Sequence, residues 1–162
     1  MFKKMICIAL VVLTLGATAC AKEEYKTDID VDDVAEALTK KISTESVWID
    51  EDEGFIEEYI KLPEYVKESH IYYAQNTNDL DEFGVFEVEK GQANAVRLML
   101  MQGYLQKRYT ENLEWYNSYM PAETPKLRDA EVRVFGNCVA YAVLSQENRK
   151  AFFDECEKLL KN

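Results

Sequence analysis

The residue types that most often catalyse reactions or bind metals are scarce in this chain. His70 is the single histidine, and neither Cys-x-x-Cys nor His-x-x-x-His occurs. Because zinc and other transition metals need several such ligands at close spacing, the sequence predicts no metal site and no cofactor. A Ser or Cys nucleophile would need His70 as its base. We expect His70, at the start of a predicted strand, to be an ordinary exposed or hydrogen-bonded residue, and we therefore predict no catalytic residue.

Carboxylates are abundant, but they carry little information about function. The chain has 30 acidic residues, so pairs at the separation used by glycoside hydrolases arise in any fold. The acidic run over residues 50–53 is similar to the start of a calcium loop, but Gly54 comes one place early and Lys61 stands where a bidentate glutamate is required. The run therefore indicates a solvated helix start, and a small hydrolase of envelope polymers stays an alternative.

Aromatic residues near the end of a predicted long helix are the one feature that points to a ligand surface. They are Tyr109, Trp115, Tyr116 and Tyr119. Rings exposed beyond the edge of a sheet could stack on the sugar faces of wall glycans or hold a peptide. A stripe at helical spacing can also simply cover the sheet, and both interpretations stay open.

The first twenty residues are typical of an export signal. Lys3 and Lys4 precede an apolar run over 5–15, and small residues over 16–19 precede Cys20. The run is shorter than a membrane-spanning helix needs, so it indicates a cleaved signal peptide. The small residues before Cys20 resemble the lipobox of bacterial lipoproteins, with Ala17 standing where leucine is usual.

This resemblance implies that Cys20 becomes the first residue of the exported chain and carries diacylglycerol and a further acyl chain such as palmitate. Ordinary cleavage after Ala19 is the alternative. The expected organisation is a signal peptide over 1–19, a lipidated cysteine and short tether over 20–28, and a single domain over 29–162. Two acyl chains anchor a protein stably. We therefore expect the membrane as a partner and a location on the outer face of the bacterial cytoplasmic membrane.

Cys138 and Cys156 are the thiols that remain once Cys7 is removed and Cys20 is acylated. An extracytoplasmic location permits a disulfide between them, which would join the last hairpin to the last helix. We place Cys138 on the hairpin face that points away from the core and Cys156 on the inward stripe of the helix. Two buried free thiols are accordingly the other interpretation.

Charge excludes one class of partner. The formal net charge is −11 with a pI near 4.6, whereas nucleic-acid binding depends on clustered Lys and Arg. Removing residues 1–19 takes away two lysines and no acid, so the exported part is more acidic still. We expect no nucleic-acid partner.

Apolar spacing predicts three helices and four strands. Asp30 is expected to cap a helix over 31–42, a long helix covers about 93–119, and Ser145 is expected to cap the last helix. A short amphipathic segment lies before Pro63. The strands are predicted over 70–75, 83–89, 131–135 and 138–144, with Gly136-Asn137 as a two-residue turn between the last two.

This order indicates an α+β domain with two layers. We predict an antiparallel four-stranded sheet made of two hairpins in ββαββα order, with an additional N-terminal helix and all helices on one face. In the second hairpin Val134 should lie opposite Val139 and Val132 opposite Tyr141, so that the Val/Tyr face meets the core. The long helix exceeds the length of the strands, and residues 109–119 should overhang the sheet.

The exported chain as a whole resembles small lipoproteins of Gram-positive bacteria that carry a domain of unknown function. The resemblance rests on the lipobox, on SHIYYAQN over 69–76, on DEFGVFEVEK over 81–90 and on the closing hairpin around Gly136-Asn137. It implies neither catalytic residues nor an activity. We expect a non-catalytic, lipid-anchored binding module with an envelope protein or cell-wall component as partner; a hydrolase and a structural or assembly subunit are the alternatives.

Overall fold

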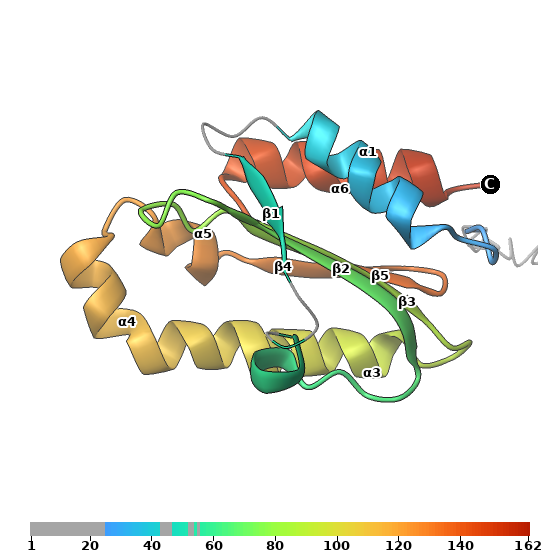
Figure 1. Cartoon of the computed structure of the whole chain (residues 1–162), viewed down its shortest axis with the longest axis horizontal. Coiled ribbons are helices and arrows are strands. Elements are labelled where there is room, and N and C mark those ends of the chain that lie inside the picture. Colours follow the sequence, from blue (N-terminus) through green and yellow to red (C-terminus); the bar gives the residue numbers. More distant parts are fainter. Residues whose placement is uncertain (1–24, 43–46, 52–53, 55) are drawn as a thin grey trace, which may run out of the picture.

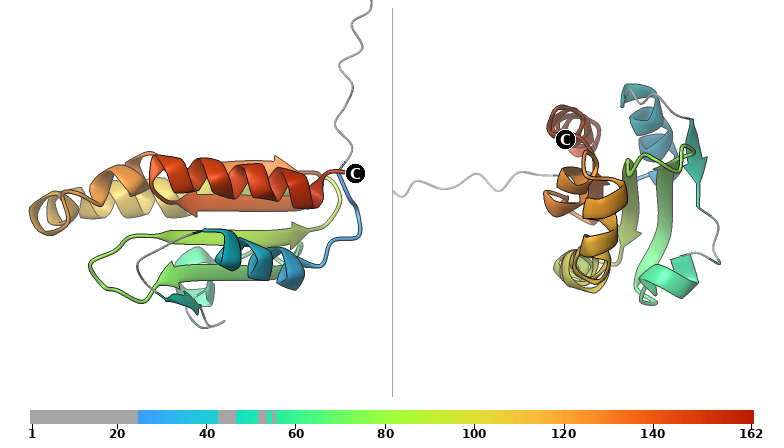
Figure 2. Two further views of the ribbon diagram at one scale, coloured as in Figure 1. Left: turned by 90° about the horizontal axis from the view of Figure 1, so that it is seen from above. Right: turned by 90° about the vertical axis from the view of Figure 1, so that its left-hand side faces the viewer.

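The computed structural model describes residues 25–42, 47–51, 54 and 56–162. The predicted signal peptide, Cys20 and the first part of the tether lie outside these residues, as does Phe55. Within the described part of the chain, no helix is both long and apolar enough to cross a membrane. Tyr25 forms an antiparallel bridge with Lys161, so the first described residues lie beside the C-terminal end of the last helix (Figure 2).

An open antiparallel sheet of five strands forms the centre of the molecule, which confirms the α+β class (Figure 1). The strand order is β1-β2-β3-β5-β4. The bounds are β1 Trp48–Asp50, β2 Val66–Ala74, β3 Glu82–Val88, β4 Glu131–Phe135 and β5 Cys138–Val143. The prediction of four strands was wrong because β1 has only three residues, too few to show an alternating pattern.

Helices cover both faces of the sheet, so the two-layer prediction was also wrong (Figures 1 and 2). One face carries α1 (Val31–Lys41) and α6 (Gln146–Leu160), and the other carries α3 (Ala93–Leu98), η2 (Met99–Gln106) and α4 (Lys107–Tyr119). Two further short helices are η1 (Ile56–Ile60) and α5 (Thr124–Arg128). The reason is that β5 is buried along its whole length, so the small residues facing away from Val139 and Tyr141 need a cover of their own.

The second hairpin and the helix starts agree with prediction. Val134 pairs with Val139 and Val132 with Tyr141, and Gly136 at the turn has a φ of +63°, which glycine adopts without strain. The Asp30 side chain accepts a hydrogen bond from the Asp33 backbone at 3.0 Å and caps α1. Ser145 caps α6 in the same way.

The predicted long helix exists, but its middle is wound differently. Residues 99–106 form the π-helical segment η2 between α3 and α4, in which each turn is wider than in an α-helix. The end of α4 runs beyond the sheet, as expected (Figure 1). The π-helical segment and the overhanging end of α4 place side chains of η2 and α4 around a cavity beside the sheet.

Candidate functional site

A cavity of about 660 Å³ lies where the ends of β2 and β3 meet η1, η2 and α4. Its size is that of a pocket for a small molecule or a short segment of polymer. The charged and aromatic side chains that line it are Glu51, Tyr59, Tyr73, Asp79, Asp81, Glu82, Tyr104, Lys107, Arg108, Glu111, Trp115 and Tyr116. It joins segments far apart in the sequence into one concave surface.

Glu82 forms the floor of this cavity and is 5% exposed. Its Oε1 accepts hydrogen bonds from the hydroxyls of Tyr104 at 2.7 Å and Tyr141 at 2.6 Å. Its Oε2 accepts a hydrogen bond from Arg108 at 2.5 Å. A buried carboxylate with this many donors is held in one position.

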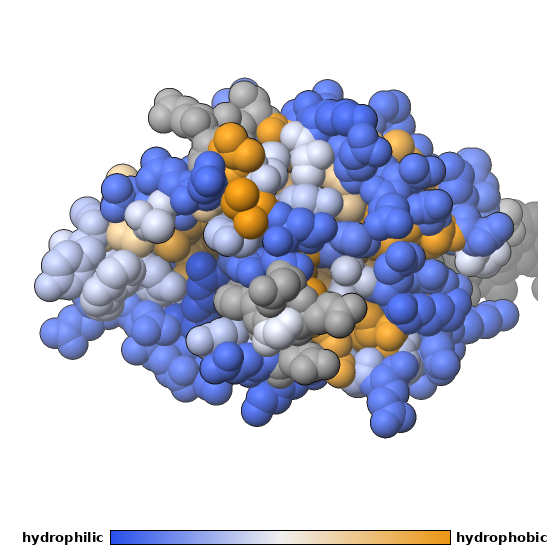
Figure 3. Space-filling model, viewed as in Figure 1, coloured by the Kyte–Doolittle hydropathy of each residue, from blue (hydrophilic) through white to orange (hydrophobic). Residues whose placement is uncertain are grey.

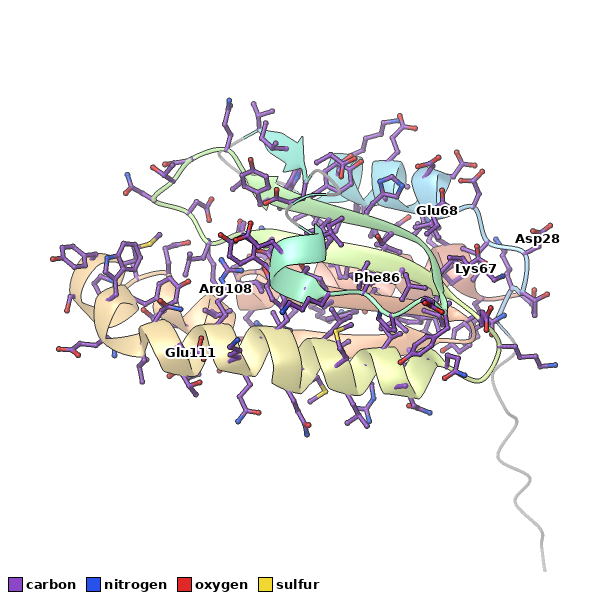
Figure 4. The ribbon with its side chains drawn as sticks, turned by 60° about the horizontal axis from the view of Figure 1, so that its bottom comes forward. Asp28, Lys67, Glu68, Phe86, Arg108 and Glu111 are labelled. Carbon is purple, nitrogen blue, oxygen red and sulfur yellow. The ribbon has the colours of Figure 1, made fainter. Side chains whose placement is uncertain are left out.

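Arg108 connects the floor to α4. Its guanidinium donates to the hydroxyl of Tyr116 at 3.2 Å and to that of Tyr104 at 3.1 Å, besides Glu82. In Figure 4 Arg108 lies between α4 and the sheet, and Glu111 lies on the same helix. Arg108 and Tyr104 are four residues apart, so helical geometry alone brings their side chains together.

The phenols of the floor stay protonated. Burial, reinforced by the negative charge of Glu82, raises the pKa of Tyr104 and of Tyr141 well above the ordinary value. Both hydroxyls are therefore donors across the physiological range. The two phenols therefore offer hydrogen bonds and do not act as acid–base catalysts near neutral pH.

Lys126 of α5 holds one wall of the cavity together. Its ammonium lies 2.9 Å from Asp79, 2.7 Å from Asp81 and 2.6 Å from Glu123. The oxygens of these three carboxylates are close enough to hold a metal ion, and Lys126 contacts all three of them. These ion pairs hold the loop between β2 and β3 against α5.

The pKa values of the two aspartates of this wall are shifted in opposite directions. Burial raises the pKa of Asp81, and the hydrogen bond from Lys126 offsets only part of this effect. Burial also acts to raise the pKa of Asp79, but hydrogen bonds from Lys126 and from the Asp81 backbone outweigh it, so that pKa is lowered.

The four aromatic residues that the sequence singled out do not form one surface. Trp115 lines the rim of the cavity and is 51% exposed, whereas Tyr116 lines it from below and is buried. Tyr119 is exposed outside the cavity, with its ring centroid 5.5 Å from that of Trp115. Tyr109 packs against the core. Trp115 and Tyr116 therefore line the cavity and Tyr109 lies against the core, while the ligand-surface interpretation stays a prediction.

Most of the molecule's outer surface in this view is hydrophilic (Figure 3). The end of α4 is paler than its surroundings there, in keeping with the intermediate hydropathy of tyrosine and tryptophan. Tyr59 of η1 is 58% exposed and lines the same cavity as Trp115. Aromatic side chains from two different segments thus border the entrance.

Cys138 and Cys156 are free and buried in the structure. Our placement of Cys138 on a face away from the core was wrong, because α6 covers that face and both thiols belong to the same hydrophobic cluster. Burial raises the pKa of Cys138 to about 12. Both are therefore unreactive thiols in the folded protein.

His70 lies apart from the cavity lined by Tyr59, Trp115 and Tyr116, which we call the aromatic cavity. Its Nε2 is 2.6 Å from Asp32 and its Nδ1 is 3.3 Å from Asp50. It borders a second hollow, of about 720 Å³, together with Glu68 and Asp50. The ring joins α1 and β1 across β2, and no side-chain nucleophile is hydrogen-bonded to it among the interactions described.

Sequence reasoning missed Glu82, Arg108 and Lys126, the three charged residues that organise the cavity. Each belongs to a stretch that is rich in charge, and neither spacing nor motif distinguishes it from its neighbours. The signal for Glu82 is its position directly before four uncharged residues of a strand, 83–86, because a charge buried there needs partners.

A scan against protein-family models found no match, and searches of curated proteins and of solved structures found none either. The resemblance to small Gram-positive lipoproteins therefore stays a prediction. The functional argument depends on the geometry of the cavity.

Proposed function

We propose that this chain is a non-catalytic binding module, held on the outer face of the bacterial cytoplasmic membrane by lipid on Cys20, whose ligand occupies the aromatic cavity. One observation carries the proposal. The cavity combines a floor in which the buried Glu82 carboxylate accepts three hydrogen bonds with a half-exposed Trp115 at its rim. A rigid polar floor with exposed rings above it is the arrangement of a binding pocket.

The state of the floor favours binding over catalysis. General acids and bases work best with a pKa near the operating pH, but Tyr104 and Tyr141 have pKa values well above it. Glu82 is an acceptor whose oxygens already receive three hydrogen bonds. A group committed in this way orients neighbours and is not available as a nucleophile.

The anchor part of the proposal rests on the sequence around Cys20. Two acyl chains are enough for stable attachment, whereas one is marginal. The chain's net charge of −11 opposes contact with anionic headgroups. Lipid would then keep close to the bilayer a domain that the surface repels. Intact mass and membrane fractionation of a Cys20→Ala variant test this, because a variant that keeps lipid mass and membrane association contradicts the anchor.

The binding part is tested with the full chain, extracted in a non-ionic detergent and immobilised. Solubilised envelope material is passed over wild type, Trp115→Ala and Leu98→Ala. Leu98 is the matched control because it is an exposed apolar residue of α3 that lies outside the cavity. We expect the same component to be retained by wild type and Leu98→Ala and lost from Trp115→Ala. Equal retention by all three proteins contradicts a ligand in the cavity.

A hydrolase of envelope polymers is the second candidate, and one observation favours it. Asp79 and Asp81, which share the cavity wall, have pKa values shifted in opposite directions, as in acid and base pairs of hydrolases. Both carboxylates, however, contact Lys126, which gives them a structural role. Turnover of an envelope polymer that disappears in Asp81→Asn while the variant stays folded would replace the binding proposal with this one.

A further inference from the structure

The charge around the aromatic cavity is predominantly negative. The acidic side chains that line it are Glu51, Asp79, Asp81, Glu82 and Glu111, and the basic ones are Lys107 and Arg108. Arg108 is already paired with Glu82 in the floor. A ligand entering the cavity therefore meets more negative than positive charge.

Lys126, behind the wall of the cavity, does not remove this imbalance, because Glu123 offsets its charge. The single ammonium of Lys126 faces three carboxylates within 2.9 Å, those of Asp79, Asp81 and Glu123. One positive charge does not balance three negative charges held this close. A second cation placed in the cavity would be attracted by the remainder, and the low dielectric of the partly buried wall strengthens that attraction.

Aromatic rings border the same space. Tyr59 and Trp115 are about half exposed at the entrance, and Tyr73 lines the cavity from β2. The face of an aromatic ring carries a negative quadrupole, so a desolvated organic cation is attracted to it. Tryptophan is the strongest of the aromatic residues in this respect.

We propose that the cavity binds an organic cation, with a substituted ammonium group held between the rim rings and the acidic wall. This inference rests on the proposed binding function and specifies the chemistry of its ligand. Two features disfavour an anionic ligand. Arg108 is committed to Glu82, Tyr104 and Tyr116, and Lys107 is the single other basic residue among those that line the cavity.

The test compares two probes of the same shape that differ in charge. Choline carries a trimethylammonium group, and 3,3-dimethylbutan-1-ol replaces its nitrogen with carbon and is neutral. Binding of each to the full chain in non-ionic detergent is measured by calorimetry. We expect choline to bind about tenfold more tightly than the neutral alcohol, since a desolvated cation–ring contact is of that order. Raising the salt concentration should narrow the difference.

Variants locate the binding. Trp115→Ala should abolish the preference for choline, and Glu111→Gln should weaken choline without affecting the neutral alcohol. The matched controls are Leu98→Ala of α3 and Glu114→Gln of α4, which alter exposed residues outside the cavity. We expect both controls to bind as wild type does.

Three results overturn the inference. Equal affinity for the two probes, no measurable binding of either, or a choline affinity unchanged by Trp115→Ala would each do so. The proposed function is judged separately by the envelope retention experiment. If retention depends on Trp115 while choline does not bind, the cavity takes a neutral ligand such as a saccharide, and only the inference fails. If neither effect is seen, both fail.

Discussion

Arg108 of α4 and Glu82 of β3 form a buried ion pair, with 2.5 Å between the guanidinium and the carboxylate. The pair joins α4 to the first residue of the central strand, and both residues line the cavity. The hydroxyls of Tyr104 and Tyr141 also donate hydrogen bonds to Glu82, and the hydroxyl of Tyr116 accepts one from Arg108. Buried pairs of this kind specify an arrangement more than they stabilise it.

Removing one partner should be costly because the other charge then stays buried alone. We expect Glu82→Gln to lower the free energy of unfolding by about 3 to 5 kcal/mol. Asp129→Asn is the control, since Asp129 pairs with Arg128 at 2.7 Å in an exposed position, and it should cost less than about 1 kcal/mol. Urea unfolding measures the free energy of unfolding of both variants, provided that their m values equal that of wild type. Similar losses for the two variants contradict a buried role for Glu82.

Gly84 leaves room for the ring that reaches Glu82. A methyl group at Gly84 would overlap the Tyr141 ring, so Gly84→Ala should destabilise the protein by about 1 to 3 kcal/mol. At Gly103 in η2 a methyl group meets nothing within 4 Å. Gly103→Ala should therefore be neutral or stabilise by about 0.5 to 1 kcal/mol. Thermal unfolding measures both variants. If Gly84→Ala unfolds at a higher temperature than Gly103→Ala, the Tyr141 ring is free to move away from the added methyl group.

Lys126→Met should destabilise most near neutral pH, where Asp79, Asp81 and Glu123 would repel one another. Burial raises the pKa of Asp81 in the native protein, so the stability linked to its protonated form is lost as pH rises through that value. Without Lys126 the hydrogen bond that lowers the pKa of Asp79 also disappears. The loss should therefore shrink as pH falls from about 7 to about 4.5.

Urea unfolding of Lys126→Met at the two pH values measures this change. Lys40→Met is the control, because Lys40 pairs with Glu36 on the exposed side of α1, and it should have little effect at either pH. A destabilisation of Lys126→Met that is as large in acid as at neutral pH contradicts carboxylate repulsion as its cause.

Cys138 and Cys156 should react with a thiol reagent only after unfolding. Both are buried, and burial raises the pKa of Cys138 to about 12, so at about pH 8 the reactive thiolate is rare. In the exported form that we propose, without Cys7 and with Cys20 acylated, labelling followed by intact mass measurement should add no label to the native protein and two labels in denaturant without reductant. Labelling that needs a reductant would show that the two cysteines form a disulfide in the exported protein.

The local features of the fold were predictable from sequence, and the contacts across it were not. The caps at Asp30 and Ser145 and the Gly136 turn depend on neighbours within a few residues, which is where sequence patterns are informative. The long-range pairs were hidden. Glu82 and Arg108 are 26 residues apart, and nothing local distinguishes them from the other charged residues.

The second helical layer was missed for a similar reason. Cys138, which we expected on the outer face, shares its side of β5 with Ala140 and Ala142, and such small residues let helices such as α1 and α6 pack closely on a sheet. Of the predicted ligand surface, Trp115 and Tyr116 reached the cavity because they follow Arg108 by about two turns on α4. Tyr109 faces the core instead.

Tryptophan fluorescence reports directly on whether a ligand occupies the cavity, because the chain has two tryptophans and, of these, Trp115 lines the cavity. Full-chain Trp48→Phe and Trp115→Phe variants each retain one of them. They are titrated with fractionated envelope components. A ligand in the cavity predicts a saturable change in Trp48→Phe, whose remaining signal comes from Trp115, and no change in Trp115→Phe. If an envelope component binds while the fluorescence of Trp115 stays constant, the ligand lies elsewhere and the account is contradicted.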